Sequence, residues 1–211
     1  MLAAPTLIAL LGAECTGKST LVAALASSLV AAGIDAVAVP EYLREFCATH
    51  GRTPCVDEQR DIACEQSSRI SRAAERHAVV VADTTAFMTA VYSEALFGDT
   101  SLYADAASAH RDYRQTLLAG LEIPWVAEGL QRDGSLARAR LDALLRVALL
   151  QRGVPFAVLV GDRAARLRAA VRVVQRCLAP PPALAPEPRW HWVCEHCGDG
   201  VCEAATKALS R

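Results

Sequence analysis

The chain has 211 residues, of which 53% are apolar and 5% aromatic, and this composition suits one compact α/β domain with a small appendage. The formal net charge of −1 gives no global field that would draw the protein to nucleic acid or to an anionic membrane. No apolar run approaches the roughly 18–20 residues of a membrane span, and the apolar start lacks the basic segment of an export signal. The 8 cysteines are therefore expected as free thiols or metal ligands of a cytoplasmic protein.

The first half of the chain alternates short apolar runs with longer helical segments. In chain order we expect a strand at Thr6–Leu11, a helix at Lys18–Ala32, a strand at Ala36–Val39, helices at Glu41–His50 and Val56–Arg76, and a strand at Ala78–Ala82. Gly33 closes the first helix and Pro40 stops the second strand.

The second half continues the alternation. We expect a helix at Thr85–Phe97, a short helix ending near His110, a strand at Tyr113–Leu118, a loop from Gly120 to Ser135, a helix at Leu136–Gln151, a strand at Phe156–Val160 and a helix at Arg163–Leu178. Strands that alternate with helices predict a parallel sheet with right-handed crossovers.

The end of the chain differs from the rest in composition. Residues 179–189 contain five prolines, which predict a stiff linker, and residues 190–211 form a distinct tail with three cysteines. We therefore predict an α/β domain at 1–178, a linker at 179–189 and a tail at 190–211.

A phosphate-binding motif follows the first predicted strand. The segment from Gly12 to Ser19, GAECTGKS, matches G-x-x-x-x-G-K-[ST] in full. Gly12 and Gly17 allow backbone conformations in which successive N–H groups converge on phosphate oxygens. Lys18 brings a positive charge to the β and γ phosphates, and Ser19 offers a hydroxyl to Mg²⁺. The motif predicts binding of ATP or a similar nucleoside triphosphate.

Acidic residues at two other strand ends could complete the site. Asp83 directly follows AVVVA and suits a water-mediated Mg²⁺ ligand or a base, although a plain helix N-cap is the alternative. Glu41 closes the second strand, and with Arg44 it could face an acceptor at the carboxyl edge of the sheet. Surface charges on a helix would give the same pattern. Glu14, unusual inside an anion cradle, is expected to point away from phosphate towards a second substrate.

Four segments carry a family resemblance. GAECTGKSTL, PEYLREF, VVVADTTAFMTAVY and PWVAEGLQRDG resemble, in the same order, the ribosylnicotinamide kinase family typified by NadR, with its single-domain AAA-type ATPase relatives. The likeness covers about residues 6–165. It implies phosphorylation of a ribosyl hydroxyl with ATP and Mg²⁺. It also implies a P-loop NTPase three-layer fold, similar to nucleotide and nucleoside kinases, with a five-stranded parallel sheet that we expect in the order 2-3-1-4-5.

The resemblance assigns roles by position. It implies acceptor contacts by Glu41, Tyr42 and Arg44, a metal or hydroxyl contact by Asp83, and a lid at Trp125–Arg132. Within that lid, Arg132 would meet the transferring phosphate, although an exposed loop charge would look the same. Val160 and Gly161 would support adenine. The phosphates would be held by Gly12, Ala13, Glu14, Cys15, Thr16, Gly17, Lys18, Ser19 and Thr20.

Two departures from the family pattern affect the expected function. Pro40 stands where an aromatic residue able to stack on a nicotinamide ring is expected, so the acceptor stays open. The chain begins just before the first strand, so adenylyltransferase and repressor activities are not expected. A regulatory ATP-binding module that controls a partner is the alternative to a small-molecule kinase, and the oligomeric state is open.

The tail predicts a second kind of metal site. Cys194, Cys197 and Cys202 offer three thiolates within nine residues, with His191 and His196 nearby as a fourth ligand. Zn²⁺ takes four tetrahedral nitrogen or sulfur ligands in structural sites. Free cysteines in a flexible tail are the alternative.

Overall fold

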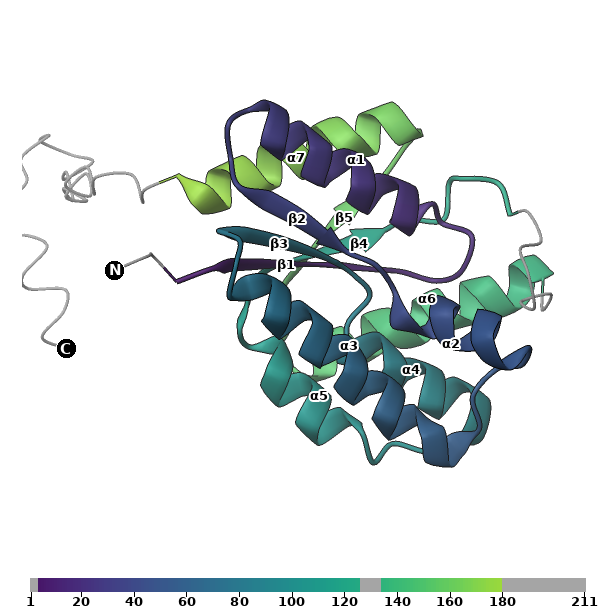
Figure 1. Ribbon diagram of the computed structural model, residues 1–211. Helices are drawn as coiled ribbons and strands as arrows, with labels where there is room; N and C mark the ends of the chain where they lie inside the picture. Colours follow the sequence, from purple (N-terminus) through teal and green to yellow (C-terminus); the bar gives the residue numbers. More distant parts are fainter. Residues whose placement is uncertain (1–3, 126–133, 180–211) are drawn as a thin grey trace, which may run out of the picture. The chain divides into compact units, whose positions relative to one another are not determined.

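The computed structural model describes residues 4–125 and 134–179. Its centre is a parallel sheet of five strands in the order β2-β3-β1-β4-β5 (Figure 1). The strands span β1 Thr6–Leu11, β2 Ala36–Val39, β3 Val79–Asp83, β4 Tyr113–Ala119 and β5 Phe156–Leu159. Both the parallel arrangement and the strand order agree with the sequence-based prediction.

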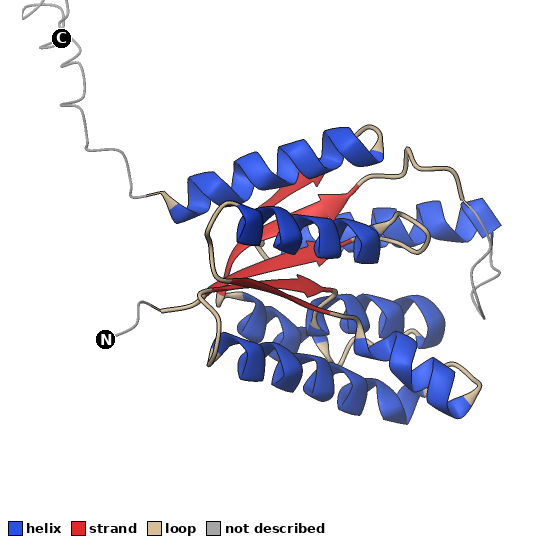
Figure 2. Cartoon of the chain, turned by 45° about the horizontal axis from the view of Figure 1, so that its top comes forward, coloured by secondary structure: helices blue, strands red, loops and turns tan. Residues whose placement is uncertain are grey.

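Helices cover both faces of the sheet (Figure 2). Helices α1 and α7 lie on one face, and α3, α4, α5 and α6 lie on the other (Figure 1). Their bounds, with those of the 3₁₀ turn η1, are α1 Lys18–Ala31, α2 Tyr42–His50, η1 Val56–Glu58, α3 Gln59–Ala74, α4 Ala86–Phe97, α5 Tyr103–His110, α6 Gly134–Gln151 and α7 Arg163–Leu178. The result is the three-layer arrangement expected of a P-loop NTPase.

Strand β1 shows how the sheet divides the core. Ile8 and Leu10 pack with residues of α1 and α7, whereas Ala9 and Leu11 pack with residues of α4 and α6. All four are fully buried. Successive side chains of a strand point to opposite faces, so a strand buried on both sides needs a continuous apolar run. The apolar run at the start of the chain is therefore a core strand.

Three predicted boundaries differ from the structure in an informative way. The helix expected at Val56–Arg76 begins with η1, and α3 starts only at Gln59. Strand β3 ends at Asp83, one residue beyond the apolar run. The helix expected from Glu41 starts at Tyr42, because Glu41 has an extended backbone with ψ of 117°. Both carboxylates therefore lie at strand-to-helix junctions.

Among the helices of the described residues, none combines the length and apolar character that crossing a membrane requires.

Candidate nucleotide and acceptor site

The phosphate loop joins β1 to α1. Gly12 has φ of 150°, and a Cβ on it would lie 3.2 Å from the Cβ and carbonyl oxygen of Ala119 on β4. Gly17 precedes α1 with a left-handed φ of 77°. A side chain at either position would strain the backbone. Cys15 takes a left-handed φ of 53° although it is not glycine, so the loop itself holds strain.

Two side chains of the loop turn back onto one carbonyl. Lys18 Nζ and Thr16 Oγ1 each donate a hydrogen bond of 2.8 Å to the carbonyl oxygen of Ala13. Lys18 is only 4% exposed. Its ammonium is therefore held inside the loop, at the N-terminal end of α1, where the helix dipole also favours an anion.

Asp83 lies beside this loop. It pairs in register with Leu10 of β1 and is only 1% exposed. Burial raises the pKa of Asp83 above its ordinary value, and the ammonium of Lys18 opposes that rise. The N-cap of α4 is Thr85, whose hydroxyl accepts a hydrogen bond of 3.2 Å from the backbone N–H of Phe87. The interpretation of Asp83 as a helix cap is therefore wrong.

Two oxygens at this place fit Mg²⁺. Oγ of Ser19 and Oδ1 of Asp83 are buried, and neither makes a hydrogen bond within the described part of the chain. The Ser19 side chain nevertheless lies close enough to Asp83 for a polar contact that lowers the Asp83 pKa, although the two groups do not meet in regular hydrogen-bond geometry. Buried polar atoms are rarely left without a partner, and Mg²⁺ prefers hard oxygen ligands. Residues 4–125 and 134–179 hold no group of three or more His, Cys, Asp or Glu suited to a metal ion, and the predicted zinc ligands lie outside them.

Glu41 joins the same neighbourhood from the end of β2. It is 8% exposed, and its Oε2 accepts a hydrogen bond of 3.1 Å from Arg44 Nε. Its charge acts on both Asp83 and the buried Tyr92, and it helps burial to raise the Tyr92 pKa. The structure thus brings Glu41, Asp83 and Lys18 together from three elements. The ring of Tyr42 lies instead under the Arg69 guanidinium, 4.4 Å away.

Gln66 of α3 links the ends of β2 and β3. Its Oε1 accepts a hydrogen bond of 2.7 Å from the backbone N–H of Tyr42, and its Nε2 lies 3.3 Å from the carbonyl oxygen of Thr84 and 3.4 Å from that of Pro40. Thr84 has a left-handed φ of 72° and a buried hydroxyl, an unfavourable state for a β-branched residue. The amide of Gln66 therefore supports a strained turn directly after Asp83.

A cavity of about 660 Å³ opens beside the loop. Its polar lining includes Glu14, Gln59, Tyr92 and Arg140, and Nε2 of Gln59 is buried without a hydrogen bond among the described residues. Glu41, Tyr42 and Arg44 are not lining residues. The remaining lining residues are mostly apolar: Leu43, Cys47, Thr53, Pro54, Ala95, Leu96, Leu136, Ala137, Leu141 and Leu144.

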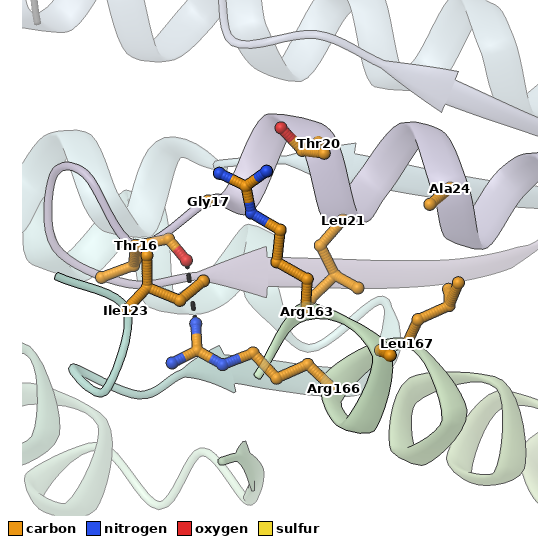
Figure 3. A pocket seen from close by; sticks show the side chains of 10 residues that line it. Thr16, Gly17, Thr20, Leu21, Ala24, Ile123, Arg163, Arg166 and Leu167 are labelled. Carbon is orange, nitrogen blue, oxygen red and sulfur yellow. Dashed lines mark hydrogen bonds between the residues drawn. The ribbon is translucent and has the colours of Figure 1, made fainter. Parts of the chain in front are cut away.

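A second pocket, of about 290 Å³, lies between the phosphate loop and the start of α7. Figure 3 shows Arg163 and Arg166 extending from α7 towards the loop, with a hydrogen bond from Arg166 to Thr16. Gly161, just before α7, has a left-handed φ of 90°. The lining residues are Thr16, Gly17, Thr20, Leu21, Ala24, Ile123, Arg163, Ala164, Arg166 and Leu167.

Comparison with known proteins agrees with this architecture. The protein-family model described as "AAA domain" matches residues 7–166. The chain belongs to this family. No curated protein sequence matched it.

The fold of this AAA domain is similar to that of solved P-loop kinases. NadR protein in complex with NR has a TM-score of 0.68 and 22% identity over 84% of this chain. NadR in complex with NAD and AMP-PNP has a TM-score of 0.66 and 22% identity over 86%. The chain spans only 52% of both NadR chains. Thymidylate kinase from Ehrlichia chaffeensis has a TM-score of 0.62 and 15% identity, with 82% of this chain and 100% of that chain covered. The expected likeness to NadR is confirmed at the level of fold.

The sequence missed several residues that line or support the site of this AAA domain. Gln59, Gln66 and Arg166 are buried polar residues inside helices, and their residue types alone do not distinguish them from surface residues. Helical periodicity offered one signal, since Arg166 lies on the same buried stripe of α7 as Ala170 and Val174. Arg132 lies outside the described residues, so its role stays a prediction.

Proposed function

We propose that the protein is a kinase that transfers the γ-phosphoryl group of ATP to a hydroxyl of a small nucleoside-like acceptor. One observation carries the proposal: the phosphate loop contributes to two cavities at once. Thr16 and Gly17 line the smaller pocket, and Glu14 lines the larger cavity. A triphosphate in the loop would therefore have space for its base on one side and for an acceptor on the other, as in-line transfer requires.

The chain's own residues would supply positioning and charge. Lys18 would neutralise the β and γ phosphates. Ser19 and Asp83 would hold Mg²⁺, which, when bound, neutralises charge on the phosphate oxygens. Either Glu41 or Asp83 would accept the proton of the acceptor hydroxyl. Arg132 would meet the transferring phosphate from the segment that follows Trp125.

The larger cavity suggests the chemistry of the acceptor. Its mostly apolar walls suit a ring, and the N–H groups of Gln59 Nε2, which have no hydrogen-bond partner among the described residues, suit a carbonyl or hydroxyl oxygen on the ligand. Glu14 lies on the lining, and its carboxylate would repel an acceptor that already carries a phosphate. Ribosylnicotinamide is one candidate, and Tyr42 and Arg44 would approach the acceptor only after a rearrangement of their side chains.

A screen of nucleosides for stimulated ADP release tests the proposal. We expect at least one unphosphorylated nucleoside to raise ADP release with Mg-ATP, and Lys18→Ala to abolish both this activity and stabilisation by Mg-ATP. Exposed Arg168→Ala is the matched control for the loss of a positive charge. A slow ATPase that no nucleoside stimulates would favour a regulatory module instead. Undiminished binding of Mg-ATP by Lys18→Ala would contradict the phosphate site.

A further inference from the structure

Arg166 is the largest fully buried side chain among the described residues, at 1% exposure. It begins the buried stripe of α7 that continues with Ala170 and Val174. Placing a guanidinium in a protein interior is costly unless its donors are satisfied. An apolar residue could occupy this buried position at a lower cost, so we expect the arginine to have a role that an apolar side chain could not perform.

All three guanidinium nitrogens of Arg166 donate hydrogen bonds. Nε donates to the carbonyl oxygen of Gly161 at 2.9 Å, and Nη1 donates to that of Thr16 at 2.9 Å. Nη2 donates to the carbonyl oxygen of Gly120 at 3.1 Å and to Glu122 Oε2 at 2.6 Å. One side chain thus joins the phosphate loop, the end of β4 and the turn after β5.

The bond to Thr16 fixes the orientation of one peptide of the phosphate loop. The peptide between Thr16 and Gly17 is planar and trans, so its N–H points opposite to its carbonyl. Fixing the carbonyl towards Arg166 therefore fixes the N–H of Gly17 away from α7.

Arg166 is itself a lining residue on the α7 side of the smaller pocket, and its bond to Thr16 spans that pocket. Thr16 and Gly17 form one wall of that pocket, and the start of α7, with Arg163 and Ala164, forms the other (Figure 3). Because Arg166 holds both walls, it sets the distance between them. We propose that Arg166 is a positioning residue that holds the phosphate loop and the base pocket at the spacing a nucleoside triphosphate needs. This inference rests on the proposed function, because it takes the smaller pocket as the site that holds the base of the nucleotide.

Binding of two ligands to Arg166→Lys tests the inference by calorimetry. Lysine keeps the charge, but its single ammonium cannot reproduce the planar fork of donors. Mg-ATP spans both walls, whereas inorganic tripolyphosphate occupies the phosphate loop alone. We expect the Kd of Mg-ATP to rise roughly tenfold or more and that of tripolyphosphate to change less than about threefold. Arg168→Lys, at an exposed position on the same helix, should change neither.

The two-ligand comparison separates positioning from a merely structural role. Equal losses for both ligands, or unchanged affinity for Mg-ATP, would overturn the inference. If Arg166→Lys fails to fold, Glu122→Gln removes only the carboxylate partner, and a selective loss for Mg-ATP of about threefold is expected. Unchanged Mg-ATP affinity in that variant would also overturn it. Two other outcomes would instead contradict the assignment of the phosphate site. In one, the wild-type protein does not bind tripolyphosphate. In the other, Lys18→Ala binds tripolyphosphate as tightly as the wild type does.

Discussion

At the scale of single residues, the candidate site concentrates features that folding alone disfavours. Asp83 is a buried carboxylate whose Oδ1 makes no hydrogen bond in the described part of the chain, and Thr84 beside it has a left-handed backbone. Cys15 in the phosphate loop is also left-handed. Such strain persists where a ligand or a reaction requires it, so removing one of these features should stabilise the empty protein.

Asp83→Asn should raise the melting temperature of the ligand-free protein and lower kcat. Because burial raises the pKa of Asp83, its ionised form is disfavoured in the folded state, and the resulting loss of stability accumulates as pH rises from the ordinary pKa to the raised folded-state pKa. Asparagine carries no charge and removes that loss. Scanning calorimetry at neutral pH with and without Mg-ATP measures both effects.

The control variant for this prediction should change the melting temperature in the opposite direction. Asp99 on the surface accepts hydrogen bonds from the backbone N–H of Ser101 and from Ser93 Oγ, and these contacts lower its pKa. Asp99→Asn should therefore slightly lower the melting temperature at neutral pH. A ligand-free Asp83→Asn protein that is less stable than the parent would show that Asp83 serves the fold.

Stability between pH 6.5 and about 4 should depend on His110. Burial lowers its pKa from 6.5 to about 4, and its Nε2 bonds to Thr116 Oγ1 at 2.8 Å. Below pH 6.5 the unfolded chain takes up a proton that the folded protein does not, so stability falls with pH until about pH 4, by roughly 3 kcal/mol in total. Urea unfolding at pH 7.5 and 4.5 should show a smaller loss in His110→Gln. The exposed-site control His50→Gln should retain the parental loss.

At the scale of elements, the site depends on where β1, β2 and β3 end. Parallel strands place their carboxyl ends at one edge of the sheet, and this edge brings Gly12, Glu41 and Asp83 together. Helix α3 adds Gln66, whose amide contacts the chain after both β2 and β3. The alignment of the two carboxylates therefore depends on a side chain from a separate helix.

Gln66→Leu should raise the KM for the acceptor and lower kcat while leaving the affinity for tripolyphosphate nearly unchanged. Leucine cannot accept the hydrogen bond from Tyr42 N–H, and loss of a buried partner costs about 1–3 kcal/mol. The start of α2 would then shift, and Glu41 with it, whereas the phosphate loop belongs to β1 and α1. Steady-state kinetics with exposed Cys64→Ser as control checks this. Equal weakening of acceptor and tripolyphosphate binding would contradict a role confined to the carboxylates.

At the scale of the whole molecule, the two cavities depend on different layers. Helices α1 and α7 enclose the smaller pocket, whereas residues from α2, α3, α4 and α6 contribute to the larger one. The phosphate loop crosses from one to the other. The division into a domain at 1–178, a linker and a tail stays a prediction, because residues 180–211 lie outside the described part.

Protein purified without chelator should contain about one zinc per chain, bound by the tail. Cys194, Cys197 and Cys202 with one histidine would supply the four ligands of a structural site. Elemental analysis of Cys194→Ser/Cys197→Ser should find the zinc lost with ATP binding retained. Cys55→Ser/Cys64→Ser, which removes two exposed thiols of the domain, should keep it. Zinc-free wild-type protein would leave the tail cysteines as free thiols.

The family resemblance accompanied the expected strand order, and the sequence by itself determined the strands and the phosphate loop. Each depends on neighbouring residues: β1, β2 and α7 have the predicted bounds, and GAECTGKS specifies its own backbone through Gly12 and Gly17. Only the tertiary structure decided which helix residues support the site. Arg166 and Thr16 are 150 residues apart, and Arg166 differs from the exposed Arg168 and Arg172 only in the face of α7 that it occupies. Burial of a polar side chain depends on partners that folding brings from distant segments, and no local pattern records those partners.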